Sequence, residues 1–524
     1  GLETLRSLGQ EFPADPDWEL AAAKVAELHN RIERENPDFL SMPPLHDQDP
    51  QLAAISEIFI GIAGAAYITS PALCVLIFVR CLELCVTRRL LPACSPWLIV
   101  GQGIHLSALL GKVEAAHEYG ETSVRLAERE SFRTFMPSAL YHQGRYVHFW
   151  RYPLRETLDL FTRGIEISHD YGDNQFIAYL TAVWSRHAFW ASIALDRMVE
   201  QATQLRDFLD VFHYDVQRRW LNIFVTAAQA LRGDSFARGA SWRGTPFDDE
   251  RDLPDMEQSG DRQGLLFAYC TKAWVATLFG DHSSVEKFID LAQYNLKTGA
   301  GLLENASIPF IYGLRYAREL RENPDRPESE QALEEQLSLL ERFAGLAPMN
   351  FAHKLSLVQA EVHRARGEVL PAMQVYEQAS QEARENGYLS EAGLAHALAT
   401  EFFQDLDLQQ AALHNLEQAS QNWRSWGADA LVESLSHRFA DLLETSGISG
   451  QLSTDEAKLQ TTATRHISSI QMDLDSILDA SKTLSSEMDL DQLKAKMMKL
   501  LMTESGATKT LLMLKQEDNW FVQA

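Results

Sequence analysis

Basic residues and cysteines are scarce in this chain of 524 residues. Its 47 Lys and Arg stand against 73 Asp and Glu, which leaves a net charge of −26. Nucleic acids and anionic membranes are bound through clustered Lys and Arg, so this balance argues against both kinds of partner. Five cysteines are too few for a disulfide framework in a chain of this size. We therefore expect a reduced, cytoplasmic setting.

Four of the five cysteines lie close together, at Cys74, Cys81, Cys85 and Cys94. The first three share one helical face, which raises the possibility of a metal site. The segment has no neighbouring His and no CxxC pair, and small buried thiols are the favoured interpretation.

Motifs for phosphate binding and catalysis are also missing from the sequence. It contains no GxxxxGK[ST] or GxGxxG loop, no HRD or DFG set, no HExxH and no GxSxG. His437 and His466 lack the surroundings of a phospho-accepting histidine. We therefore assign no catalytic residue, cofactor site or metal site to this chain.

One apolar run, residues 58–79, has no charged residue and is long enough to span a bilayer. It is interrupted by Ser70-Pro71, and a Ser-Pro step favours a turn followed by a new helix. The sequence predicts two buried antiparallel helices of about 12 and 15 residues here rather than a membrane span.

Helical periodicity extends over residues 18–443, and an internal repeat specifies its form. Residues 376–388 match residues 416–428 at an offset of 40, with EQASQ identical in both. Weaker copies of the pattern follow Gly111 and Gly280. A period of this length is typical of helix-pair repeats, whose small residues allow close packing. The sequence predicts an all-α fold, an α-solenoid with a concave face.

Three polar segments interrupt the array. Residues 233–258 lose the apolar stripe and predict a long surface loop. Residues 322–331 carry two prolines and separate two helices. Residues 445–454 are rich in Ser and Gly and mark the end of the array.

A heptad pattern follows the array and predicts a helical connector. Its apolar positions, with one polar member, recur at alternating intervals of three and four. They form a candidate seam for dimerisation or signal relay: Ile467, Ile470, Leu474, Ile477, Ser481, Leu484 and Met488. A parallel dimer is one interpretation, and a single helix packed on a neighbouring domain is the other.

The last residues predict the start of another domain. An amphipathic helix is followed by a break at Gly506 and by two short strands, 511–514 and 520–522, which form a hairpin. The chain then ends, so this α/β domain is expected to be incomplete.

Three parts of the sequence, residues 40–129, 149–154 and 475–514, together resemble multi-sensor signal transduction multi-kinases. In that family a Ser/Thr kinase-like domain and an AAA-type ATPase precede a TPR-like region, which is followed by GAF and histidine kinase domains. The chain departs from the common TPR pattern because it lacks the Trp/Gly/Tyr/Pro signature at 34-residue spacing.

This resemblance implies four parts: a TPR-like solenoid (1–444), a linker (445–465), a signalling or coiled-coil helix (466–488) and an incomplete GAF start (489–524). It implies a non-catalytic region that couples an upstream ATPase or kinase module to GAF and histidine kinase domains. ATP and Mg would then be needed only elsewhere in the parent protein. The implied partners are protein domains, with a homodimer possible through the connector.

Two other functions stay open. One is a ligand-sensing solenoid of a signal-transduction ATPase, which a pocket lined by Trp and Arg would favour. The other is a TPR adaptor with a carboxylate clamp for a peptide terminus. Six aromatic residues are either interaction anchors or core residues between helix pairs: Phe149, Trp150, Tyr152, Trp184, Phe189 and Trp190.

Overall fold

The computed structural model describes residues 1–45, 48–234, 237–296, 301–445, 512–516 and 519–523. The chain divides into two compact units. The first comprises Gly1–Val199 and Val216–Leu452, and the second comprises Glu200–Asp215 and Ser453–Ala524.

The described residues form 22 α-helices: α1 (Leu2–Ser7), α2 (Trp18–Glu35), α3 (Pro50–Thr69), α4 (Pro71–Arg88), α5 (Ser95–Leu110), α6 (Val113–Ala127), α7 (Met136–His142), α8 (Thr157–Tyr171), α9 (Asn174–Trp190), α10 (Leu195–Val211), α11 (Asp215–Arg232), α12 (Asp249–Ser259), α13 (Arg262–Phe279), α14 (His282–Asn295), α15 (Glu304–Glu322), α16 (Pro327–Leu346), α17 (Pro348–Ala365), α18 (Val369–Glu385), α19 (Leu389–Asp405), α20 (Gln409–Trp426), α21 (Asp429–Arg438) and α22 (Ala440–Thr445). Short 3-10 or π turns are η1 (Glu130–Phe135), η2 (Gln143–Val147), η3 (His148–Trp150) and η4 (Leu154–Glu156). The strands are β1 (Ala237–Arg238), β2 (Ser241–Trp242), β3 (Leu512–Gln516) and β4 (Asn519–Gln523).

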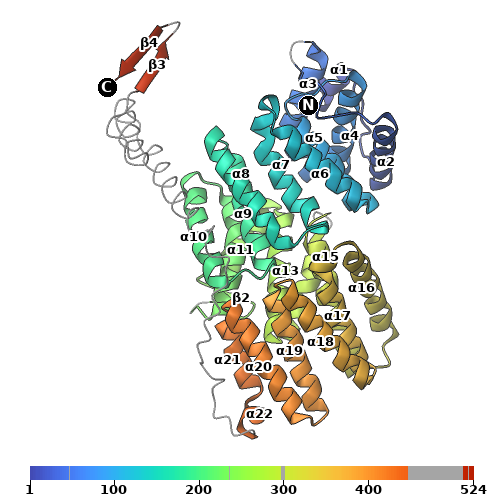
Figure 1. Cartoon of the computed structure of the whole chain (residues 1–524), viewed down its shortest axis with the longest axis vertical. Coiled ribbons are helices and arrows are strands. Elements are labelled where there is room, and N and C mark those ends of the chain that lie inside the picture. The colour runs from blue at the N-terminus through green and yellow to red at the C-terminus, as the bar shows by residue number, and fades with distance from the viewer. Residues whose placement is uncertain (46–47, 235–236, 297–300, 446–511, 517–518, 524) are drawn as a thin grey trace. The chain divides into compact units, whose positions relative to one another are not determined.

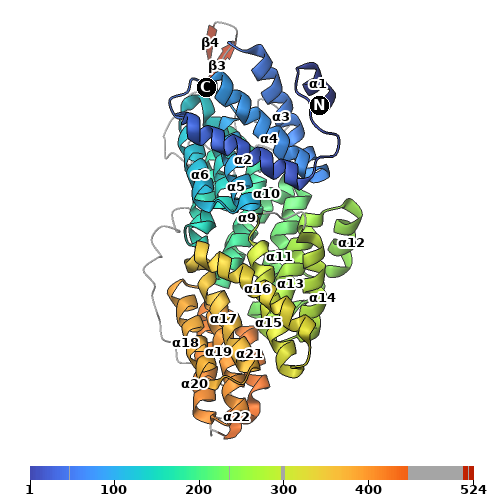
Figure 2. The same ribbon diagram turned by 90° about the vertical axis from the view of Figure 1, so that its right-hand side faces the viewer.

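The predicted all-α class is confirmed, and the helices follow one another as packed antiparallel neighbours. The most extensive contacts join α5 with α6, α13 with α14, α17 with α18, and α19 with α20. These pairs can be followed along the first unit in Figures 1 and 2. The arrangement is consistent with a helical repeat.

The 40-residue period spans one helix pair, α18 and α19, and its two matching stretches lie in α18 and α20 with the turns that follow them. Ala379 in α18 and Ala419 in α20 occupy matching positions and are both fully buried or nearly so. The two helices are followed by Gly387 and Gly427, which adopt positive φ angles of 75° and 89°. A residue with a Cβ atom adopts this conformation only with strain, so the glycines end each helix at the same point.

The weaker copies of the repeat also combine a glycine of positive φ at a helix end with small buried residues. Gly111 and Gly280 both have positive φ angles, 65° and 72°, and each precedes a helix. The small residues that come next along the pattern, such as Ala116 in α6 and Ala292 in α14, are completely buried. Small buried residues thus bring the paired helices close together in several repeats.

The uncharged run folds as two helices, α3 and α4, with Pro71 as the first residue of α4. The predicted break is confirmed, but the helices are longer, 20 and 18 residues. Only α4 is buried along most of its length. In α3 the stretch Pro50–Tyr67 is long and apolar enough to cross a membrane by length and composition, and 33% of it is buried. The prediction of two buried helices is therefore wrong for α3, because only one of its faces packs on the protein.

The four clustered cysteines are buried free thiols. Burial raises the pKa of Cys74 to about 12, so its thiol stays protonated at neutral pH. This agrees with the packing role that the sequence favours. No group of three or more His, Cys, Asp or Glu that could hold a metal occurs among the described residues.

The prediction of a long surface loop at residues 233–258 is wrong. Apart from 235–236, which are not described, this segment contains the β1–β2 hairpin and α12. Trp242, Phe247 and Met256 are fully buried and anchor it. The buried Lys272 of α13 lies 4.1 Å from the ring of Trp242 and pairs with Asp249 at 2.8 Å. A few large side chains therefore replace the missing apolar stripe.

The other polar breaks have different outcomes. Within the predicted break at 322–331, residues 323–326 separate α15 from α16, and Pro327 is the first residue of α16. In the second unit β3 pairs with β4 in an antiparallel hairpin, Leu512 opposite Gln523, which confirms the predicted hairpin. The predicted linker beyond Thr445, all seven seam residues and the predicted helix before the hairpin lie outside the described residues.

Repeats far apart in the sequence also touch. In a solenoid each repeat contacts only its neighbours, yet the indole Nε1 of Trp426 donates to the carbonyl of Ile193 at 3.0 Å. The rings of Phe189 and Trp426 lie 6.3 Å apart. Within the first unit, contacts therefore extend beyond neighbouring repeats.

Candidate functional site

A cavity of about 510 Å³ lies between α15 and α16. One face of α15 lines it at intervals of four, three and four residues, and one face of α16 lines it in the same helical manner. The lining from these helices is Asn305, Pro309, Tyr312, Tyr316, Glu335, Gln336, Leu339, Arg342 and Phe343. The remaining lining residues are Ser107, Ala108, Trp150, Gln293, Leu296 and Gly301.

Four aromatic rings dominate the cavity wall. Trp150 and Phe343 lie with their ring centroids 5.4 Å apart at 45°. Tyr312 and Tyr316 stack at 5.5 Å and 9°. Trp150, Tyr312 and Phe343 are each no more than 7% exposed. The rings are therefore held in place by the surrounding protein and present preformed stacking surfaces.

The two tyrosines are positioned by charged neighbours outside the cavity. The Arg315 guanidinium lies over both rings, 5.9 Å from Tyr312 and 5.4 Å from Tyr316. The Tyr312 hydroxyl donates to Asp290 at 2.8 Å. Burial, and then this bond, raise the pKa of Tyr312 far above its usual range, and burial also raises the pKa of Tyr316. Both tyrosines are therefore neutral near pH 7.

The polar lining is balanced in charge. Glu335 and Arg342 lie two turns apart on α16, are both exposed, and contribute one charge of each sign. Three carboxamides, Gln293, Asn305 and Gln336, supply donors and acceptors. Pro309 has no amide hydrogen, so the Asn305 carbonyl loses its usual helical donor. With aromatic rings, carboxamides and one charge of each sign, the cavity is suited to a ligand that binds by stacking and hydrogen bonding.

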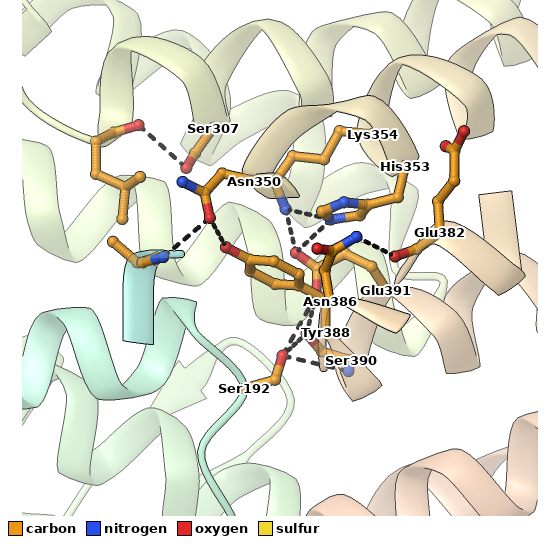
Figure 3. A network of polar contacts seen from close by, with 12 residues as sticks. Ser192, Ser307, Asn350, His353, Lys354, Glu382, Asn386, Tyr388, Ser390 and Glu391 are labelled. Carbon is orange, nitrogen blue, oxygen red and sulfur yellow. Dashed lines mark hydrogen bonds and ion pairs between the residues drawn. The ribbon is translucent and has the colours of Figure 1, made fainter. Parts of the chain in front are cut away.

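A second feature, a buried polar network, joins α17 and α19 to an earlier part of the chain (Figure 3). Lys354 of α17 forms an ion pair with Glu391 of α19, and both side chains are almost completely buried. Ser390 also donates to Glu391. The hydroxyls of Ser390 and Ser192 lie 2.6 Å apart, although 198 residues separate them in sequence.

Asn350 extends this network to the segment that runs from η3 to the start of η4. Its amide nitrogen donates to the carbonyls of Phe149 at 2.6 Å and Tyr152 at 2.9 Å. Its oxygen accepts from the amide of Leu154 at 2.9 Å and from the hydroxyl of Tyr388 at 2.7 Å. One buried carboxamide thus uses its whole hydrogen-bonding capacity, with three bonds to this segment and one to Tyr388.

The protonation states of the network follow from burial and from the ion pair. Burial, and then the charge of Lys354, lower the pKa of His353 to about 4. Burial alone would raise the pKa of Glu391, but the charge of Lys354 and bonds from His353 and Lys354 hold it well below its usual range. At neutral pH the network therefore contains a charged pair beside a neutral imidazole.

Ion pairs also connect successive repeats at their helix ends. Arg321 of α15 pairs with Glu361 of α17 at 3.0 Å. Arg364 of α17 pairs with Asp405 of α19 at 2.7 Å. Arg438 of α21 lies 3.4 Å from Glu401 of α19. Each step spans about one repeat, so these charges reinforce the contact between neighbouring pairs.

The six aromatic residues singled out in the sequence are mostly interior. Phe149, Trp150, Trp184, Phe189 and Trp190 are at most 7% exposed, whereas Tyr152 is 36% exposed. Five of them are thus not surface anchors in this structure. Only Trp150 lines the cavity. The side chain of His437 is 82% exposed, and His466 lies outside the described residues.

Sequence reasoning missed the rest of the cavity and the buried network. Tyr312 and Tyr316, four apart in a helix, were a signal for a stacked pair. Asn350, Lys354 and Glu391 gave no such signal, because polar residues in a helix are ordinarily exposed.

Comparison with known proteins leaves the chain without an assigned family. No protein-family model matches it, and no curated protein is similar to it in sequence.

Proposed function

We propose that the chain is a non-catalytic protein-interaction and signal-relay region of a larger sensor kinase. In this proposal the first unit is a TPR-like α-solenoid, and the hairpin β3–β4 belongs to the start of a GAF domain. It couples an upstream ATPase or kinase module to GAF and histidine kinase domains, in the cytoplasm and without nucleic acid or a membrane span. Its partners are protein domains.

The observation that carries this proposal is the bonding of Asn350 and Ser390 to residues about 200 positions earlier. These bonds join helices of the last repeats to the segments that flank α8 and α9. If the segments that flank α8 and α9 move, the hydrogen bonds that join them to the last repeats are strained, because buried hydrogen bonds tolerate little change in length or angle. The movement is therefore passed to the last repeats. The last repeats lead into the connector, which carries the change onward.

The relay is tested by the kinase output of the multidomain protein. Inserting one residue next to Ser481 rotates everything beyond it by about 100° in a helix. We expect altered phosphorylation, while insertion of seven residues, two whole turns, restores the output. Unchanged output with the single insertion contradicts the relay.

Dimerisation through the seam has a separate test. Light scattering compares the 524-residue chain with a chain truncated at Gly450. We expect a dimer only for the longer chain. If both chains form particles with the same number of protomers, the connector has no role in dimerisation.

The cavity favours a second candidate, a helical-repeat region that senses a small molecule. Its lining includes Trp150 and Arg342, and a pocket lined by Trp and Arg is expected of this function. A cavity of about 510 Å³ is within the range of ligand sites in proteins. A metabolite would act by changing how α15 packs on α16.

A further inference from the structure

We infer that the cavity between α15 and α16 binds a small, planar aromatic molecule without net charge. This inference rests on the second candidate function, sensing of a small molecule, and specifies its ligand class.

The arrangement of the rings indicates a planar aromatic ligand. Trp150 and Phe343 form one pair, and Tyr312 and Tyr316 form the other. Both tyrosines line the cavity, and Arg315, which lies over their rings, does not. Aromatic rings gain most from offset stacking or edge contacts with another ring. An aliphatic molecule would fill the space without that gain.

The charges indicate a neutral ligand. The buried part of the lining consists of Ser107, Trp150, Pro309, Tyr312 and Phe343, none of which carries a charge at neutral pH. An ion placed against these groups would lose its hydration without a partner. Glu335 and Arg342 are exposed and oppose each other in sign. The carboxamides of Gln293 and Gln336 match a ring with both donors and acceptors.

The dimensions indicate a single small molecule rather than a partner helix. Residues of α5, η3, α14, α15 and α16 all line the cavity, so walls surround it on several sides. An α-helix is about 10 to 12 Å wide with its side chains and needs an open groove several turns long. The cavity of about 510 Å³ provides room for one or two fused rings with their substituents.

Binding is tested on the intact chain with four probes. Indole and adenine are planar, aromatic and neutral, benzoate is planar and anionic, and cyclohexanol is neutral but not planar. Saturation-transfer NMR and titration calorimetry at pH 7.5 measure the affinities. We expect indole or adenine to bind at least about tenfold more tightly than benzoate or cyclohexanol. Only indole and adenine combine an aromatic ring that can stack with the absence of a net charge.

Two matched pairs of variants place the binding in the cavity. Tyr316→Phe keeps the ring and should bind like the unaltered chain, whereas Tyr316→Leu should bind about tenfold more weakly. Leu339→Trp fills the cavity and should abolish binding. Ser338→Trp adds the same bulk at an exposed neighbour that does not line the cavity, and should leave binding unchanged. Circular dichroism and thermal melts show which variants fold.

The outcomes separate the ligand class from the function. If benzoate or cyclohexanol binds most tightly and Leu339→Trp abolishes that binding, the inferred class is wrong and small-molecule sensing survives. If no probe binds at millimolar concentration, the inference is overturned and the cavity no longer supports sensing. If binding occurs but both tryptophan variants retain it, the site lies elsewhere and the inference also falls.

Discussion

The side-chain amide of Asn350 donates to the backbone carbonyl of Phe149 at 2.6 Å, although 201 residues separate them in sequence. Such a bond closes a very long loop, whose cost in chain entropy must be met by other contacts. Those contacts include the bonds of Asn350 to Tyr152, Leu154 and Tyr388. This buried side chain, together with the bonds of Ser192 to Ser390 and of Trp426 to Ile193, therefore holds two distant parts of the first unit together.

Replacing this side chain should be costly. Asn350→Leu keeps the approximate volume but leaves two buried carbonyls, one amide and one hydroxyl without their partner. We expect a loss of about 2 to 4 kcal/mol in the free energy of unfolding, measured by urea denaturation. Asn30→Leu, at an exposed position of α2, is the control and should change stability by less than about 0.5 kcal/mol. An equal effect of the two variants contradicts the role of Asn350.

The buried pair of Lys354 and Glu391 should be sensitive to the loss of either partner. Lys354→Met alone or Glu391→Gln alone leaves the other group without its partner, and we expect each to lose about 3 to 5 kcal/mol. The double variant should lose clearly less than the sum, as a double-mutant cycle in urea would show. Additive losses would mean that the two groups do not interact.

The exposed pair of Lys24 and Glu27 is the matched comparison. Its atoms approach to 2.6 Å, yet its side chains are 49% and 67% exposed. Solvent screens such a pair, so Lys24→Met should cost less than about 1 kcal/mol.

Two helical glycines should respond to alanine in opposite directions. A Cβ atom at Gly393 in α19 would lie 2.2 Å from the indole Nε1 of Trp423, which donates to the carbonyl of Ser390 at 3.1 Å. Gly393→Ala should therefore destabilise the protein by about 1 to 3 kcal/mol. At Gly345 in α16 nothing lies within 4 Å of the added atom. Gly345→Ala should stabilise by up to about 1 kcal/mol, because alanine favours the helix. Thermal melts of both variants check these signs.

His353 should make the protein lose stability in mild acid. Its pKa is about 4 in the folded chain, below the value of about 6.5 in an unfolded one. The unfolded state therefore binds the proton first, and the stabilisation present above pH 6.5 is lost as the pH falls toward 4. We expect a contribution of about 2 kcal/mol to the loss between pH 7.5 and 5.

The variant His353→Gln should reduce that pH dependence when urea denaturation is repeated at each pH. The groups facing His353 are Lys354, Glu391 and the stacked ring of Tyr388. Glu391 titrates at lower pH, since its folded pKa is depressed. His437→Gln, at an exposed position, should leave the dependence unchanged. Identical pH profiles for the two variants contradict the assignment to His353.

The helix pairs could be predicted because their determinants are local. Ala379 and Ala419 mark close approach, and Gly387 and Gly427 mark the helix ends, within one stretch of sequence each. The break before Pro71 is local in the same sense. The segment at 233–258 was mispredicted because Trp242 folds inward onto Lys272, a residue of a different helix.

The amino-acid sequence by itself determined the all-α class, the 40-residue repeat and the hairpin near the C-terminus, since apolar period, small residues and turn glycines act over a few residues. Only the tertiary structure decided that Asn350 meets Phe149, that Lys354 meets Glu391, and that Trp150 joins Tyr312 around one cavity. These contacts depend on how whole helices pack together, including helices about 200 residues apart in the sequence. No local pattern encodes that packing, because it follows from the sum of many contacts.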